Sequence, residues 1–223
     1  MHHNGHLAGH VKDSTKKNPS NLADAMALLD QPGLTFADMR AHFDGLDADG
    51  CWSEVERYGK KQLVRMYELA AEAEAIEAAH FVPEALGELA VVRHRGRNSI
   101  PVPIGAIRWF EKPMTRVAQH PGVFCGYNEG ATRDIIGPGF FICRPTDAHE
   151  MERGAWVVDY LQVPEGPMPE GWPTIKPNEQ GLQRWVYAGT RDYMRKVSDR
   201  VSIGMPFRGD SCLGMPFVLV RYD

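Results

Sequence analysis

A basic segment with interleaved aromatic residues near the C-terminus could bind an anionic group. Between Arg184 and Arg208 the chain has six basic residues and two acids, a local charge of 6 minus 2, or +4, whereas the whole chain carries −4. Trp185, Tyr187 and Tyr193 alternate with these cations. Arginine and tyrosine at one end of an apolar cavity can hold the carboxylate or phosphate of an amphipathic ligand. The competing interpretation is a solvated basic face whose cations pair with acids on neighbouring strands.

The predicted ligand site combines this segment with an earlier strand. In the sequence WVVDYLQV, Asp159 falls among apolar neighbours and Tyr160 follows it. The residues that we expect to contact the ligand are Asp159, Tyr160, Arg184, Trp185, Tyr187, Tyr193 and Arg195. Periodicity does not decide between a strand and a short helix for residues 184–197. The ligand that suits these residues is a small, mainly hydrophobic molecule, with or without an anionic group.

The alternative hypothesis is an enzyme, either an isomerase, a cyclase or a hydrolase, that uses the same cavity with His, Asp and Tyr as acid–base groups. A thiol, an imidazole, a phenol and two carboxylates lie close together in the sequence and are suited to nucleophilic or acid–base catalysis. They are His120, Cys125, Tyr127, Glu129 and Asp134. The simpler interpretation is a buried cysteine and a histidine in a Pro-Gly turn. The sequence has no Walker A, GxGxxG or HExxH motif, and GDSCLG predicts a hairpin turn. It therefore assigns no catalytic residue.

An acidic stretch, FDGLDADGCWSEVE, resembles a calcium-binding EF-hand loop, which needs spaced carboxylates, a glycine and a final glutamate. The match is incomplete. With Gly50 at the glycine position, Gly45 stands where the first carboxylate belongs, and a loop that starts at Asp47 is two residues short. The other interpretation is a polar connection in which Ser53 and Glu56 form a capping box for the next helix. The sequence leaves calcium binding open.

Composition narrows the class of protein. The chain has 223 residues, is 43% hydrophobic and carries no global positive charge, so we expect one principal core and no nucleic-acid partner. The four cysteines lie far apart and form no zinc-type spacing, which predicts reduced thiols, no bound metal and no cofactor. No apolar run is long enough to span a bilayer and the N-terminal residues lack the apolar core of a secretory signal, so we expect a cytoplasmic location. A homodimer remains open.

The chain divides into three expected parts: a disordered tail over residues 1–20, a helical section over 21–82, and a β-barrel domain over 83–223. The tail is polar and histidine-rich. Apolar residues at helical spacing predict helices from Asn21 to about Leu29, from Phe36 to Phe43 with Thr35 as N-cap, and a long one from Ser53 to Ala79.

The second half of the chain has the pattern of about eight short antiparallel strands. The expected strands cover residues 89–94, 100–110, 124–127, 134–144, 156–163, 185–187, 201–207 and 215–222, with a turn over 93–98 and a bend at GPG 137–139. Eight such strands close most readily as a barrel with room for one small ligand, and the runner-up is a strongly curved sheet covered by the long helix. We predict an α+β protein whose N-terminal helices pack on this barrel or sheet.

Over residues 132–222 the order GPGFFICR, GAWVVDYLQVP, RDYMRKVSDRVSIG and FVLVRYD resembles the lipocalin-like (calycin-type) β-barrel domains of bacterial proteins. The chain lacks the GxW motif near the first strand and places its long helix before the barrel. The resemblance implies a barrel that binds a small hydrophobic ligand. It implies no reaction.

Overall fold

The computed structural model describes residues 27–100, 108–118 and 122–222. The tail over residues 1–20, most of the helix predicted from Asn21, and His120 lie outside these ranges. Within them, helices come first and an antiparallel sheet follows, so the α+β prediction is confirmed.

Short helices make up the first part of the described chain. They are η2 (Leu28–Asp30), α1 (Phe36–Asp44), α2 (Ala48–Val55), α3 (Lys60–Leu69), η3 (Ala70–Glu72) and α4 (Ala78–Phe81). Helix α1 starts as predicted, because Thr35 and Asp38 form a reciprocal capping box: the Thr35 hydroxyl accepts the Asp38 N–H at 3.2 Å, and the Asp38 carboxylate accepts the Thr35 N–H at 3.2 Å.

The long helix predicted from Ser53 to Ala79 is wrong. Helix α2 begins before it, at Ala48, where the Asp47 carboxylate accepts the Gly50 N–H at 2.8 Å and caps the helix. Helix α2 ends at Val55. Gly59, whose backbone is extended (φ −91°, ψ −177°), is the N-cap residue of the next helix, α3. Ser53 therefore lies inside a helix and does not cap one. Periodicity alone missed the break because apolar residues continue at helical spacing on both sides of it.

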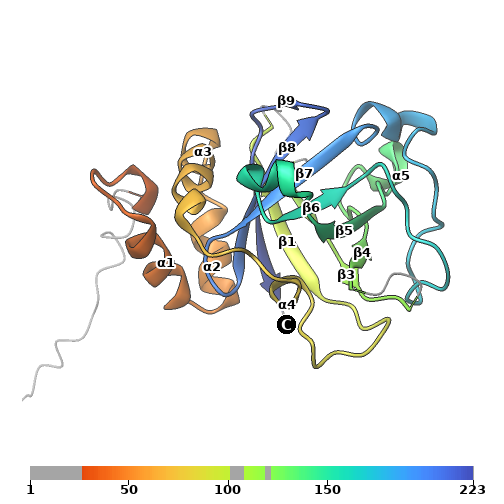
Figure 1. The fold of residues 1–223 in the computed structure, drawn as a ribbon, viewed down its shortest axis with the longest axis horizontal. Helices are drawn as coiled ribbons and strands as arrows, with labels where there is room; N and C mark the ends of the chain where they lie inside the picture. The colour runs from red at the N-terminus through yellow and green to blue at the C-terminus, as the bar shows by residue number, and fades with distance from the viewer. Residues whose placement is uncertain (1–26, 101–107, 119–121, 223) are drawn as a thin grey trace, which may run out of the picture.

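The strands form one antiparallel sheet in the order β2-β1-β10-β8-β7-β6-β5-β4-β3, with β9 paired to β8. Their bounds are β1 Arg93–Asn98, β2 Trp109–Glu111, β3 Met114–Thr115, β4 Phe124–Gly126, β5 Phe141–Pro145, β6 Trp156–Asp159, β7 Thr190–Lys196, β8 Val201–Arg208, β9 Ser211–Cys212 and β10 Phe217–Tyr222. Isolated bridges join Val92 to Met114 and Glu111 to Glu129, so the two ends of this order meet. The sheet is strongly curved, and Figure 1 shows it curling away from helices α1 to α3.

Three predicted strand boundaries need correction. Residues 93–98, expected as a turn, form β1, in which Arg95 stacks on Trp52 at 4.5 Å and Arg97 donates to the Glu56 carbonyl at 2.8 Å. The polar composition of this stretch predicted a turn, but its arginines contact the helical section and the stretch forms a strand. The strand expected over 134–144 starts later, after α5 (Arg133–Ile136) and the predicted Gly-Pro-Gly bend. Residues 185–187, expected as a strand, are the end of a 3-10 helix, η6 (Gly181–Trp185), and the turn after it. A further 3-10 helix, η5 (Ala148–Arg153), precedes β6.

The C-terminal strand separates two apolar cores. Phe217 and Leu219 of β10 face the inside of the curled sheet, where Phe124, Phe141 and Trp156 pack. Val218 and Val220, together with Val201 and Ile203 of β8, face the other way and pack against residues of α1, α2 and α3. The strand expected over 215–222 is therefore present as β10, and its apolar residues alternate between two covered faces.

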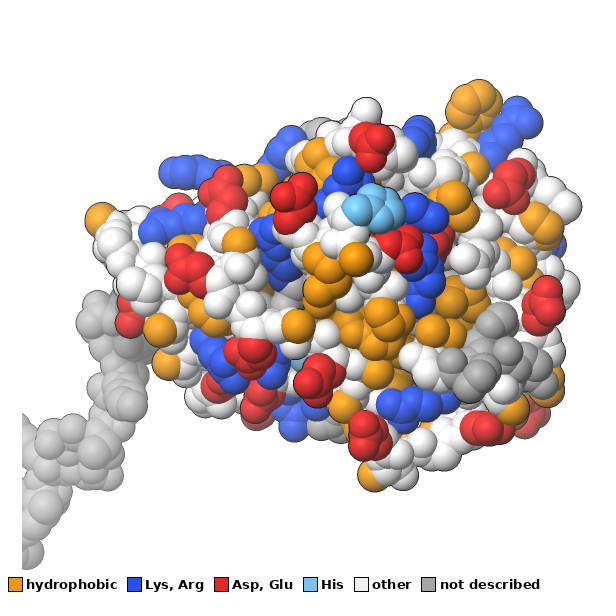
Figure 2. All heavy atoms as spheres, in the orientation of Figure 1, with side chains coloured by type: hydrophobic (Ala, Val, Ile, Leu, Met, Phe, Trp, Pro, Cys, Tyr) orange, Lys and Arg blue, Asp and Glu red, His pale blue; other side chains and the backbone are white. Residues whose placement is uncertain are grey.

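None of the helices in the described ranges has the length and hydropathy of a membrane span. Figure 2 shows acidic and basic side chains intermixed over the visible face of the molecule.

Candidate functional site

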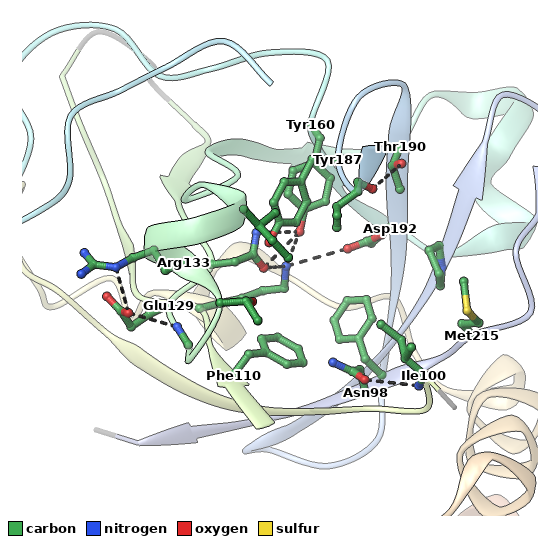
Figure 3. Close-up of a pocket in the computed structure, with 18 of the residues that line it drawn as sticks. Asn98, Ile100, Phe110, Glu129, Arg133, Tyr160, Tyr187, Thr190, Asp192 and Met215 are labelled. Carbon is green, nitrogen blue, oxygen red and sulfur yellow. Dashed lines mark hydrogen bonds and ion pairs between the residues drawn. The ribbon is translucent and has the colours of Figure 1, made fainter. Parts of the chain in front are cut away.

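A pocket of about 490 Å³ opens on one side of the curled sheet, a volume typical of small-molecule sites. Most of its wall is aromatic or aliphatic. These apolar wall residues are Ile100, Trp109, Phe110, Ile136, Trp185, Val186, Tyr187, Leu213, Met215 and Phe217. In Figure 3, Tyr160, Tyr187 and Asp192 lie across the pocket from Phe110, and Arg133 and Glu129 lie to one side. The wall can bury an apolar molecule, and polar side chains line the base and the rim of the pocket.

The polar groups at the base of the pocket cluster around the amine of Lys112, whose side chain is 2% exposed. Its Nζ donates to Asn128 Oδ1 at 2.7 Å, makes a short hydrogen bond with the Tyr160 hydroxyl, and lies 3.8 Å from Asp192 Oδ2. Asn128 Nδ2 also donates to the Tyr160 hydroxyl at 3.2 Å. We call Lys112, Asn128, Tyr160 and Asp192 the basal cluster.

Aromatic rings surround the Lys112 ammonium and replace water around it. Ring centroids of Phe141, Tyr160, Phe217 and Phe110 lie 4.9, 5.0, 5.2 and 5.5 Å from Nζ. Such rings attract a cation, but they solvate it less well than water does. Burial is the larger effect: it lowers the pKa of Lys112 to about 8, although the Asp192 carboxylate opposes this shift.

Burial acts on the acids of the cluster in the opposite direction. It raises the pKa of Asp192 to about 6 against the opposing influence of Lys112, and it raises the pKa of Tyr160 well above its ordinary value. Lys112 and Asp192 thus both titrate within about one unit of pH 7. Buried groups with pKa values displaced toward neutrality are typical of functional sites.

Strand pairing places the basal cluster. Asp192 of β7 lies opposite Val158 of β6, so it shares the inner face with the apolar core, and Tyr160 follows β6 directly. The Tyr160 ring stacks on Tyr187 with centroids 5.1 Å apart. Lys112 follows β2, and its backbone N–H donates to the His94 carbonyl of β1 at 2.9 Å. The side chains therefore rest on rigid elements.

The rim carries two arginines. Arg133 pairs with Glu129 at 3.2 Å and with the exposed Asp134 at 3.0 Å. Arg208 donates to the Trp185 carbonyl at 3.4 Å and lies 3.5 Å from Thr190 Oγ1. The two acids offset the charge of Arg133, so Arg208 is the rim cation that can face an anionic group, whereas the base holds an amine and a carboxylate together.

The structure brings three of the predicted ligand residues into the pocket and places four elsewhere. Tyr160, Trp185 and Tyr187 line it. Asp159 is fully buried on the opposite face of the sheet, where its Oδ2 accepts from Arg144 Nη2 at 2.9 Å and from Arg191 Nε at 3.1 Å.

The other three are outside the pocket as well. Arg184 is exposed and stacks on the Trp185 ring at 4.8 Å. The Tyr193 hydroxyl donates to Glu150 at 2.6 Å, and Arg195 lies over the Tyr67 ring at 4.0 Å. Tyr193 and Arg195 alternate with Asp192 along β7, so they point away from it. The predicted set joined residues from both faces of the sheet.

The residues suggested for catalysis are not assembled around one point in the described structure. The Cys125 thiol is buried beside Met168, with its pKa raised by burial to about 12, and Asp134 is exposed. Glu129 lines the pocket, and its carboxylate accepts a 3.1 Å hydrogen bond from Tyr127.

The acidic stretch forms helix α2 and its cap, where Asp47 is bonded to Gly50, so these residues do not form an EF-hand loop. In the part of the chain that the structure describes, no group of three or more potential metal ligands is found.

Sequence reasoning missed three of the four basal residues: Lys112, Asn128 and Asp192. Asp192 was counted only as a compensating charge in the basic segment. A signal for Lys112 exists in WFEKP, where a lysine directly follows an apolar strand and precedes a proline.

Searches of protein-family models, curated proteins and solved structures find no match for this chain.

Proposed function

We propose that this protein binds a small, mainly hydrophobic molecule in the pocket, with a polar oxygen of the ligand placed at the basal cluster. The observation that carries the proposal is the basal cluster itself: four hydrogen-bonding side chains at the bottom of a pocket of about 490 Å³ whose wall is largely aromatic and aliphatic. Apolar walls with a few convergent polar groups are the usual form of a small-molecule site.

The charges favour a neutral acceptor at the base. Lys112 and the Tyr160 hydroxyl are donors, so they can receive a carbonyl or hydroxyl oxygen. Asp192 Oδ2 lies only 3.8 Å from the amine, so a carboxylate or phosphate placed there would face a like charge. An anionic group of the ligand would sit better at the rim beside Arg208.

The relationship to lipocalin-like barrels expected from the sequence belongs to the same proposal. It is supported by the antiparallel sheet that curls around the pocket and by apolar residues on its inner face.

Thermal shift with matched ligands tests the binding proposal. Decanol and 2-decanone should raise the melting temperature of the full chain, because a ligand that binds only the folded state stabilises it. Decanoate should act more weakly. Substituting Met215→Trp, which adds bulk on the pocket wall, should remove the shift, and Met151→Trp, on an exposed residue outside the pocket, should keep it. Equal shifts in both variants, or none in the wild type, would overturn the proposal.

An enzyme that moves protons next to a carbonyl is the second candidate. Asp192 favours it, because it faces the pocket and its pKa is raised to about 6, a suitable value for a general base. Incubation of 2-decanone with the protein in deuterated water should then place deuterium beside the carbonyl, and Asp192→Asn should stop this exchange. A rate equal to that of buffer alone would exclude this candidate for that probe.

A further inference from the structure

We propose that Lys112 forms a reversible covalent imine with an aldehyde or ketone ligand held in the pocket. This inference rests on the proposed function, since it requires the ligand to enter the same pocket. It names the ligand class, a hydrophobic carbonyl compound, and the atom that captures it, the amine nitrogen Nζ.

The position of Lys112 singles out its amine. Among the described residues that line the pocket, Lys112 is the only one with a primary amine. The side chain is 2% exposed, so a molecule reaches Nζ through the pocket and not from bulk solvent. A carbonyl compound with an apolar tail would therefore be oriented with its reactive end at the amine.

The surroundings of Lys112 increase the fraction of reactive amine. An imine forms from the free amine, and burial lowers the pKa of Lys112 to about 8. At pH 7 this leaves about one-tenth of the side chain as free amine, whereas an ordinary lysine of pKa 10.5 has about 3 parts in 10,000. A lysine desolvated in a hydrophobic pocket is a recognised nucleophile toward carbonyl groups.

The basal cluster also supplies the proton transfers that imine formation needs. The Nζ lone pair attacks the carbonyl carbon, a C–N bond forms, and the carbonyl oxygen takes a proton from the Tyr160 hydroxyl or from protonated Asp192. Nζ then loses one proton to the Asp192 carboxylate, which leaves a neutral carbinolamine. Protonated Asp192 passes that proton to the hydroxyl oxygen as the C–O bond breaks, so the oxygen leaves as water and a protonated imine forms. The protonated imine loses its N–H proton to the group that gave up the first proton, which restores Tyr160 or Asp192 to its starting state. The balance is one amine plus one carbonyl giving one imine plus one water, with no oxidant or reductant.

The distances are compatible with these roles. Asp192 Oδ2 lies 3.8 Å from Nζ, and the Tyr160 hydroxyl is hydrogen-bonded to Nζ. A carbonyl carbon bonded to Nζ would hold its oxygen close to both groups. Asn128 Oδ1, at 2.7 Å, keeps the amine at the base of the pocket.

Reductive trapping tests the inference on the full chain. The protein is incubated with octanal and sodium cyanoborohydride at pH 7, which converts an imine to a stable amine, and the modified peptide is located by mass spectrometry. We expect one adduct, on Lys112, at octanal concentrations that leave the exposed Lys60 and Lys61 unmodified. Adducts on exposed lysines without one on Lys112 would overturn the inference.

Three variants and a non-covalent probe separate the failure of this inference from that of the proposed function. Lys112→Gln should lose the adduct. Met151→Trp, outside the pocket, should keep both the adduct and the binding of 1-anilinonaphthalene-8-sulfonate, and Met215→Trp should lose both. If Lys112→Gln does not fold, the wild-type peptide map and Met215→Trp decide the question. Octanal that displaces the probe without forming an adduct refutes the imine and leaves the pocket function standing. Binding of neither the probe nor octanal refutes both.

Discussion

Replacing Asp159 by asparagine should destabilise the fold without changing ligand binding. This carboxylate is fully buried and accepts four hydrogen bonds: from Arg144 Nη2 at 2.9 Å and Nε at 3.3 Å, from Arg191 Nε at 3.1 Å, and from the Leu161 N–H at 3.0 Å. Asparagine keeps the shape but removes the charge that two guanidinium groups share. Breaking a buried ion pair by removing one partner costs roughly 3–5 kcal/mol.

The exposure of the arginines places the expected loss at the lower end of that range. Arg144 and Arg191 side chains are 17% and 31% exposed, so water can partly compensate them. We therefore expect Asp159→Asn to lower the free energy of unfolding by about 3 kcal/mol. Urea unfolding followed by tryptophan fluorescence measures this loss, which should appear as a lower midpoint with an unchanged slope.

Asp147→Asn is the matched control. It removes a carboxylate from the same arginine, 3.5 Å from Arg144 Nη1, but the Asp147 side chain is 53% exposed. A surface pair of this kind contributes about 0–1 kcal/mol. If both variants lost the same small amount, burial would not be what makes the Asp159 pair important, and the reasoning would be refuted.

Two further predictions concern the basal cluster and one backbone contact. In the folded protein the pKa of Asp192 is about 6, above its ordinary value of 3.8. Between pH 3.8 and pH 6, the folded state therefore keeps a proton on Asp192 that the unfolded state has lost. The stability that wild type has relative to Asp192→Asn should therefore fall by about 2 kcal/mol as the pH rises from 4 to 7. Parallel urea titrations of the two proteins with no such trend would contradict the assignment. Gly154→Ala should lower the free energy of unfolding by roughly 2 kcal/mol or more, because the added Cβ would lie 2.5 Å from the Met194 carbonyl oxygen at a φ of +153°. At Gly87 an added Cβ has nothing within 4 Å, so Gly87→Ala should change that free energy by no more than about 0.5 kcal/mol. Equal melting temperatures for the two variants would refute this prediction.

Local patterns predicted much of the fold. The Thr35 cap and the apolar spacing of Phe36, Met39 and Phe43 are enough to place α1, and the apolar run over residues 215–222 is enough to predict the strand that forms β10. Each depends on neighbours within a few positions. The helix break at Gly59 was missed because the same apolar period continues on both sides of it.

The candidate site depended on contacts that no local pattern contains. Lys112 is bonded to Asn128 and Tyr160, 16 and 48 positions away, and the four are brought together only when β2, β6 and β7 share one curved sheet. A lysine or aspartate in a sequence favours the surface, and only the register decides that Asp192 faces the pocket while Asp159 faces Arg144. The aromatic part of the site, Tyr160, Trp185 and Tyr187, was foreseeable because aromatic residues mark apolar walls.

The most direct test of the central claim, that the pocket binds a hydrophobic molecule, is a fluorescence titration with 1-anilinonaphthalene-8-sulfonate. Wild type and Met151→Trp should each show one saturable site, and Met215→Trp, with its pocket filled, should show none while keeping the same circular dichroism. Equal, saturable binding by all three proteins would place the probe outside the pocket and contradict the claim.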